Sequence, residues 1–287
     1  MFGLIITTLS VFGGYAMAGG HLLALFQPLE LLMIAGAATG SFIAANNLKI
    51  IKSTISQIFS VIISFGYSKK FYVELLSLLF EIVNKMKKDG IISIENELEN
   101  LDESTIFNKY PLVKKDKEIM EFLSDYLRII ITGRVDMHQL ESLMDEDIES
   151  FIGEKEQSIH AITQVADSMP AFGVVAAVMG IVHTMEAMGG PPEELGALIG
   201  QALVGTFLGV LIGYAFTAPF ASIIEHKLHA AVKGLNTIKI VLLASVNNLS
   251  PAIAVEFGRK VLYAKERPNS RELEELIKTL KQNKPAT

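Results

Sequence analysis

Lysine and arginine are unevenly distributed along this 287-residue chain, and their distribution constrains the fold more than any other feature. Residues 49–155 hold 14 of the 25 cationic side chains, and residues 227–287 hold the other 11. The stretches 1–48 and 156–226 hold none. Cation-free stretches of this length are typical of membrane spans and of the short loops translocated with them. The chain is therefore predicted to divide between lipid and water.

The two cation-free stretches contain four apolar runs. Residues 2–17, 168–185 and 195–224 carry no Asp, Glu, Lys or Arg, and residues 22–47 carry only Glu30. Since a helix needs about 20 such residues to cross roughly 30 Å of hydrocarbon, we predict four transmembrane helices. The first is the weakest, because it is short and contains three hydroxyl residues.

The first run also permits a different interpretation, a cleaved signal peptide ending at Ala16-Met17-Ala18. A signal peptide normally begins with a cationic region, and here no cation precedes Lys49. We therefore favour a membrane span over a cleaved segment.

The location of the charges predicts the topology. The links 18–21 and 186–194 contain no cation, so the long charged segments are expected to face the cytoplasm together with both termini. The predicted architecture is an all-α polytopic membrane protein with four transmembrane helices and a helical cytoplasmic domain between spans two and three. Its predicted parts are spans one and two, the cytoplasmic domain, spans three and four, and a cytoplasmic helical tail, at residues 1–48, 49–165, 166–225 and 226–287.

The cytoplasmic segments have the periodicity of helices. Apolar residues recur at helical spacing over 71–88 and 116–132, and again from Leu140 to the third span, which we expect to continue that helix. The cations at 85–88 and the acidic run 95–103 form either a charged docking tip or a solvated helical hairpin. The charge pattern alone leaves both open.

The predicted spans are rich in small residues and poor in titratable groups. Gly205, Gly209 and Gly213 recur at a spacing of four, which favours close helix–helix packing. Glu30 falls in the outer half of the second span, and spans three and four have no internal carboxylate. A proton relay usually needs such groups at depth. If the chain conducts ions, we therefore expect a partner to supply the key carboxylate.

Several classes of protein are disfavoured. The chain has no cysteine, so a disulfide scaffold or a Cys-ligated metal site is excluded. Its net charge of −6 makes it a poor nucleic-acid binder. His226 and His229 alone are weak support for a metal site. Because no nucleophile–base pair or phosphate-binding loop appears, we expect no enzyme activity, no catalytic residue, no metal and no cofactor.

The segment 167–183, DSMPAFGVVAAVMGIVH, resembles the third span of the MotA family of flagellar motor stator proteins. Four other stretches agree in the order expected of that family. They are VFGGY at 11–15, LMDED at 143–147, LVGTFLG at 203–209 and AIAVEFGRK at 252–260. The resemblance runs nearly end to end.

The resemblance implies a function and partners. Subunits of that family form a pentameric ring around a MotB-like single-span protein in the bacterial inner membrane. The partner supplies the membrane aspartate that takes the proton, and it anchors to peptidoglycan. Proton passage, with the proton as transported ion, is thought to turn the ring, whose cytoplasmic domain drives a FliG-like rotor protein. Membrane lipid would surround the ring.

The resemblance also implies roles for individual residues. Pro170 and Pro219 match the two functional prolines of the family, and a proline inside a helix removes a hydrogen bond and permits a kink or a hinge. Thr206 matches the threonine near the ion path, and Ala177 matches a small lining residue.

Three charged residues match the family's rotor contacts: Lys87, Glu95 and, more weakly, Asp147. Lys87 stands where the family has arginine, so it lacks the bidentate geometry of a guanidinium group. Asp147 stands where the family usually has glutamate. The sign of the charge is the same in both cases.

Three alternatives remain at this point. Sodium-driven relatives tend to carry two adjacent threonines in the fourth span, whereas Gly205 precedes Thr206 here, which favours protons. An energiser of the ExbB/TolQ class, which drives an outer-membrane system, would usually have three spans. A membrane scaffold without ion flux is the third alternative.

Overall fold

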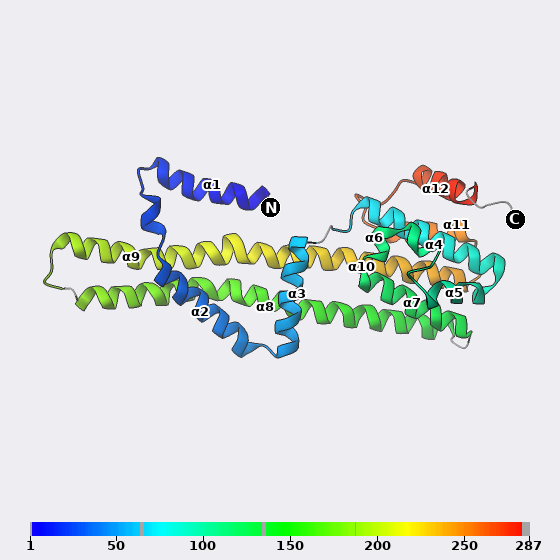
Figure 1. Ribbon diagram of the computed structural model, residues 1–287, viewed down its shortest axis with the longest axis horizontal. Helices are drawn as coiled ribbons and strands as arrows, with labels where there is room; N and C mark the ends of the chain where they lie inside the picture. Colours follow the sequence, from blue (N-terminus) through cyan, green and yellow to red (C-terminus); the bar gives the residue numbers. More distant parts are fainter. Residues whose placement is uncertain (1, 64–65, 134–135, 187, 283–287) are drawn as a thin grey trace. The chain divides into compact units, whose positions relative to one another are not determined.

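A computed structural model describes residues 2–63, 66–133, 136–186 and 188–282 (Figure 1). Within these ranges the chain is helical and contains no β-strand, as the sequence predicts. It forms two compact units. The first, which we call the apolar unit, comprises Met1–Ser64 and Glu154–Glu225, and the second, the polar unit, comprises Phe65–Gly153 and His226–Thr287.

The apolar unit is built from long helices. Its elements are α1 (Phe2–Met17), η1 (Leu22–Leu25), α2 (Pro28–Ala45), α3 (Leu48–Ile63), the second part of α8 (Met137–Glu186), α9 (Pro192–Val210), η4 (Leu211–Thr217) and the start of α10 (Ala218–Val246). The third predicted span does continue the helix that precedes it, because α8 runs for 50 residues without a break.

Three helical stretches in the described part of the chain are long and apolar enough to cross a membrane. They are Leu22–Ala45, Met137–Glu186 and Pro192–Val246. The apolar helix α1 has 16 residues, which at 1.5 Å per residue is about 24 Å, less than the roughly 30 Å of a bilayer core. The prediction of four crossings therefore stays a prediction.

The outer surface of α8 beyond Pro170 is strongly apolar. Six of its apolar side chains are more than half exposed: Val174, Val175, Val178, Met179, Val182 and Met185. An apolar surface this continuous is typical of a helix that meets lipid or another subunit. This surface supports a membrane location for this part of the chain.

The polar unit is organised around α4 (Lys69–Asp89). On this helix Leu75, Leu76, Leu78, Leu79 and Ile82 are all fully buried. Burial on several sides is wider than the single apolar stripe that the sequence suggests, and it marks a central helix. Around it lie α6 (Pro111–Lys114), α7 (Lys117–Thr132), α11 (Pro251–Val261), α12 (Ser270–Gln282) and the short elements η2 (Ile91–Ile94), α5 (Glu95–Glu99) and η3 (Phe107–Lys109).

Local capping fixes the ends of these helices. The Ser68 hydroxyl accepts a hydrogen bond from the Phe71 N–H at the start of α4, and the Asp116 carboxylate accepts one from the Ile119 N–H at the start of α7. α7 ends at Gly133, whose φ of 64° is the left-handed conformation that glycine adopts easily. Side-chain and glycine caps thus satisfy the backbone groups that helix ends leave unpaired.

A partly buried ion pair joins the end of α4 to the acidic run. The Lys85 ammonium donates to Glu97 Oε1 at 2.8 Å, and the hydroxyls of Ser104 and Thr105 donate to the same carboxylate. The run 95–103 and the cations 85–88 are therefore partly paired inside the polar unit, while Lys87 and Glu95 stay exposed.

The environment of Glu97 shifts its titration. Burial by itself would raise the pKa of the Glu97 carboxyl, but the hydrogen bonds from Lys85 and Ser104, the charge of Lys85 and the bond from Thr105 together lower this pKa to about 2. A lowered pKa means that the ionised pair stabilises the fold at neutral pH. This contribution is lost as pH falls from about 4.5, the ordinary value, toward 2.

We predict that Glu97→Gln loosens the segment 91–107. The amide keeps the size of the side chain but loses the charge that Lys85 neutralises, which costs roughly 1.5–3 kcal/mol for hydrogen bonds to a charged group. Hydrogen exchange of the full chain in detergent should speed up more than tenfold in this segment at pH 7. Glu103→Gln, an exposed position of the same run, is the control. Equal exchange in the two variants would contradict the prediction.

Candidate functional site

The helices α8 and α9 of the apolar unit touch backbone to backbone. A methyl group built on Gly173 would lie 2.8 Å from the carbonyl oxygen of Gly205 and 3.0 Å from Gly209 Cα. A methyl group on Gly209 would lie 2.7 Å from the carbonyl oxygen of Met169. Side chains cannot fit at such distances, so the spacing of small residues in the sequence does predict this contact. We call this contact the glycine seam.

Pro170 lies in the same contact. Because proline has no N–H, the carbonyl of Ala166, four residues earlier, has no partner at that position of the helix ladder. A methyl group on Gly213 would lie 2.6 Å from this oxygen and 3.2 Å from Pro170 Cδ. The freed carbonyl thus faces a glycine of η4, which leaves room for it.

The second predicted proline follows an irregular helical segment. Residues Leu211–Thr217 form a π-helix, and the Ala218 N–H donates to the Gly213 carbonyl with a spacing of five residues. Pro219 comes next, and its ring would crowd the carbonyl four residues earlier in a regular α-helix. The sequence predicts a kink at Pro219, and the structure has a widened helical turn directly before it. Such π-segments occur frequently at functional sites.

The other two predicted ion-path residues also lie along the seam. The Cα of Thr206 would be 3.3 Å from a methyl group on Gly173, and its side chain is partly buried. Ala177 is 6% exposed and lies one turn beyond Gly173 on α8. Pro170, Thr206 and Ala177 are therefore brought to a single helix pair, and Pro219 lies in the same unit.

Thr184 behaves differently from Thr206. Its hydroxyl donates to the Gly180 carbonyl of its own helix at 2.8 Å, which is the usual fate of a hydroxyl in a membrane helix. Thr184 therefore offers a matched comparison for any role of Thr206.

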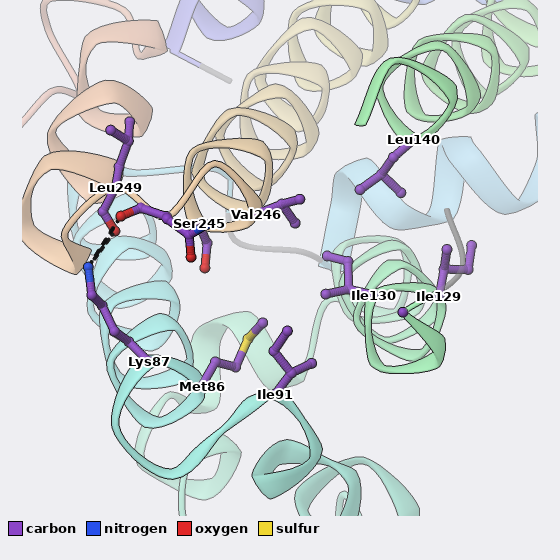
Figure 2. A pocket seen from close by; sticks show the side chains of 11 residues that line it. Met86, Lys87, Ile91, Ile129, Ile130, Leu140, Ser245, Val246 and Leu249 are labelled. Atoms are coloured by element: carbon purple, nitrogen blue, oxygen red, sulfur yellow. Dashed lines mark hydrogen bonds between the residues drawn. The ribbon is translucent and has the colours of Figure 1, made fainter. Parts of the chain in front are cut away.

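The predicted rotor contacts belong to the polar unit. Lys87 is exposed at the end of α4, and its ammonium donates to the carbonyls of Asn248 and Leu249, each at 3.3 Å (Figure 2). Those carbonyls follow α10, so the cation lies where it favours a helix C-terminus. An ammonium has three donors, and these contacts use two of them. The sequence did not reveal this structural role.

A pocket of about 230 Å³ lies beside Lys87, and Figure 2 shows apolar side chains around it. Several helices of the polar unit contribute to its wall. The lining residues with apolar side chains are Met86, Ile91, Ile129, Ile130, Leu140, Val246 and Leu249. The candidate rotor surface thus combines a cation with an apolar hollow.

Glu95 and Asp147 are held by different elements. Glu95 is the first residue of α5 and is exposed. Asp147 lies on α8, is also exposed, and accepts a hydrogen bond from the Tyr126 hydroxyl of α7 at 3.1 Å. Tyr126 fixes the direction of the Asp147 carboxylate without neutralising its charge. Both carboxylates are therefore available on the surface of the polar unit.

Besides the burial of Glu97, sequence reasoning did not predict that Arg259 and Glu30 are buried. Arg259 is only 4% exposed, and its guanidinium donates to both carboxylate oxygens of Glu256 and to the Pro268 carbonyl. The hydrogen bonds from Arg259 lower the pKa of Glu256. The stretch 252–260 lies within α11, and its Arg259 links this helix to the segment before α12. Glu30, which the sequence places in the outer half of the second span, is 7% exposed.

No group of three or more His, Cys, Asp or Glu residues within the described ranges could hold a metal ion.

Two family models match the chain. The model for the motility protein A N-terminal domain matches residues 1–90, and the model for the MotA/TolQ/ExbB proton channel family matches residues 114–237. Together with the apolar helices and the glycine seam, these matches define a member of the MotA/TolQ/ExbB proton channel class.

Comparison with individual proteins is more specific. The chain is 45% identical to motility protein A of Salmonella typhimurium (strain LT2) over 98% of this chain and 95% of that protein. The chain therefore belongs to the motility protein A family, the stator subunits that the segment 167–183 indicates. An outer-membrane energiser and a sodium-driven stator subunit are not favoured.

Solved structures support the same fold. The chain matches a structure of C. jejuni MotAB with a TM-score of 0.79 at 17% identity, covering 94% of this chain and 97% of that one. It also matches a structure of the flagellar MotAB stator complex from Bacillus subtilis with a TM-score of 0.75 at 23% identity, covering 93% and 96%.

We predict that Gly209→Ala separates α8 from α9. The added methyl group would meet the Met169 carbonyl at 2.7 Å, and overpacking of this kind costs roughly 1–3 kcal/mol. The thermal midpoint of the purified protein in detergent should fall. Gly200→Ala on the same helix, with nothing within 4 Å, is the control. An unchanged thermal midpoint in Gly209→Ala would contradict the prediction, because it would mean that α8 and α9 are not closely packed at this residue.

Proposed function

We propose that this chain is the ring-forming subunit of a proton-driven stator in the bacterial inner membrane. It forms a pentamer around a MotB-like single-span protein that binds peptidoglycan, and both of its termini lie in the cytoplasm. Residues 1–48 and 166–225 cross the membrane, and residues 49–165 and 226–287 form the cytoplasmic part. The observation that carries the proposal is the 45% identity to motility protein A over 98% of the chain.

The proton path combines two chains. The partner contributes the membrane carboxylate, because spans three and four have none, and this chain contributes the walls near Thr206 and Ala177. The proton is the transported ion, and no enzyme activity or cofactor is involved. The two solved structures that the chain matches are of MotAB complexes, which supports the pairing with a MotB-like protein.

The coupling of proton passage to movement depends on the points at which the helices bend most easily. Pro170 and η4 lack regular hydrogen bonds, so bending there costs less than elsewhere in the two helices. A change in the charge of the partner's carboxylate at the glycine seam would be relieved by movement at these points. Since α8 is part of the polar unit before Pro170 and α10 is part of it after Pro219, the movement passes to the polar unit.

The polar unit contacts a FliG-like rotor protein through charge. Lys87 presents a positive charge, and Glu95 and Asp147 present negative charges, to residues of opposite sign on the rotor. Contacts between exposed charges are individually weak and exchange quickly, which suits a surface that must bind and release at each step.

Swimming tests this function as a whole. Co-expression of the chain with a MotB-like single-span protein should restore swimming to a bacterium that lacks its own stators. The chain without the partner should not restore it. Normal swimming after deletion of the chain from its own host, with no second stator present, would overturn the proposal.

We predict that Thr206→Val lowers partner-dependent proton flux at least tenfold while the complex assembles normally. Valine keeps the shape of threonine but removes the hydroxyl that faces the proton path. Thr184→Val is the control, because its hydroxyl bonds to its own helix. Equal flux in both variants, measured with a pH-sensitive dye in vesicles, would assign no ion-path role to Thr206.

We predict that Lys87→Glu abolishes swimming without reducing the amount of complex in the membrane. Lys87→Gln should keep more function, because its amide can still donate to the carbonyls of Asn248 and Leu249. Lys117→Glu, an exposed cation at the start of α7, is the control and should swim normally. If Lys87→Glu lowers the amount of complex as much as it lowers swimming, Lys87 has only a structural role.

A further inference from the structure

Glu30 is a buried carboxyl inside the apolar unit. It is the third residue of α2 and is 7% exposed, and its Oε2 atom has no hydrogen-bond partner among the described residues. It is also the only residue with a charged side chain in the run 22–47. A buried polar atom without a partner is costly, so its presence calls for a physical reason.

The carboxyl of Glu30 fits a notch made by two glycines. A methyl group on Gly205 would lie 2.6 Å from Glu30 Oε2, and a methyl group on Gly180 would lie 3.6 Å from Glu30 Oε1. Gly180 is on α8 and Gly205 is on α9, so the carboxyl enters the glycine seam from α2. Gly205 directly precedes Thr206, which places this carboxyl beside the predicted proton path.

The surroundings offer no neutralising charge. Residues 1–48 and 156–226 contain no lysine or arginine. Within residues 1–48 and 166–224 the other titratable side chains are all exposed, and His183 Nδ1 lies 3.5 Å from a Glu186 carboxylate oxygen. These exposed groups are Tyr15, His21, Asp167, His183, Glu186, Glu193, Glu194 and Tyr214. The burial of Glu30 is therefore not explained by an ion pair with any of them.

We propose that Glu30 is a second proton-binding site of the stator, on the entry side of the path. An ionisable residue inside a membrane segment is a candidate functional group by default. Glu30 lies close to the link 18–21, which is the outer end in the predicted topology. Its carboxylate would accept a proton from water at that end and then donate it toward the partner's carboxylate. Only the O–H bond forms and breaks in this step.

The notch suits a proton better than a sodium ion. A proton needs one oxygen atom, whereas a metal cation that leaves water needs several oxygen ligands to replace its hydration shell. At the two glycines that form the notch, the neighbours other than Glu30 are alanine atoms, namely Ala176 Cβ beside Gly205 and Ala202 Cα and Cβ beside Gly180. This inference rests on the proposed function, because it requires that the complex conducts protons.

The test compares variants of Glu30 in the complex with the MotB-like partner. Glu30→Gln keeps the size and the hydrogen-bonding groups but cannot exchange a proton. Glu186→Gln, an exposed carboxyl at the end of α8, is the matched control. We expect Glu30→Gln to assemble at wild-type levels and to lose at least tenfold in dye-detected proton flux. The control should keep wild-type flux.

A third variant guards against a merely structural effect. Glu30→Asp keeps a carboxyl in a shifted position, so it should conduct, with the midpoint of its flux–pH profile displaced from that of the wild type. Wild-type flux in Glu30→Gln, or an unchanged midpoint in Glu30→Asp, would overturn the inference alone. If the wild-type complex shows no proton flux, the proposed function fails and the inference falls with it.

Discussion

The contact between α8 and α9 through glycine is the interaction on which the rest of the apolar unit depends. Lipid provides no hydrophobic drive for helix association, so these helices must gain van der Waals contact from close approach. Gly173 and Gly209 permit backbone contact, and every larger residue at these positions would meet a main-chain atom of the other helix. The same close approach brings Thr206, Ala177 and the carboxyl of Glu30 to a single region.

Both predicted prolines lie next to irregular backbone close to this contact. Pro170 cannot donate to the Ala166 carbonyl four residues earlier, and Gly213 leaves space for that oxygen. The π-helical segment before Pro219 lies opposite. The irregular position at Pro170 of α8 therefore faces the irregular segment η4. A tightly packed contact of this kind transmits small displacements, whereas a loosely packed one would absorb them.

Much of the fold could be predicted from the sequence. The cation-free stretches located the long apolar helices, and apolar periodicity predicted the continuity of α8. The spacing of Gly205, Gly209 and Gly213 predicted close helix–helix packing but not that α8 is the partner. These features are local or periodic, so a single sequence expresses them. The number of membrane crossings depends on α1, whose 16 residues are fewer than a span normally needs.

The parts of the site that sequence reasoning missed depend on residues far apart in the chain. Glu30 is buried because Gly180 and Gly205, about 150 and 175 positions later, leave space for it. Glu97 looks like any other member of an acidic run, but the hydroxyl of Ser104 and the ammonium of Lys85 hold it inside the polar unit. The bonds from Lys87 to the carbonyls after α10 are likewise non-local.

Partner-dependent proton flux tests the central claim most directly. The chain and its MotB-like partner would be reconstituted in vesicles that enclose a pH-sensitive dye, and an inward proton gradient would be applied. The account predicts acidification that needs both chains and that stops when the carboxylate in the partner's span is replaced by its amide. Flux from this chain alone, or no flux from the complex, would contradict the account.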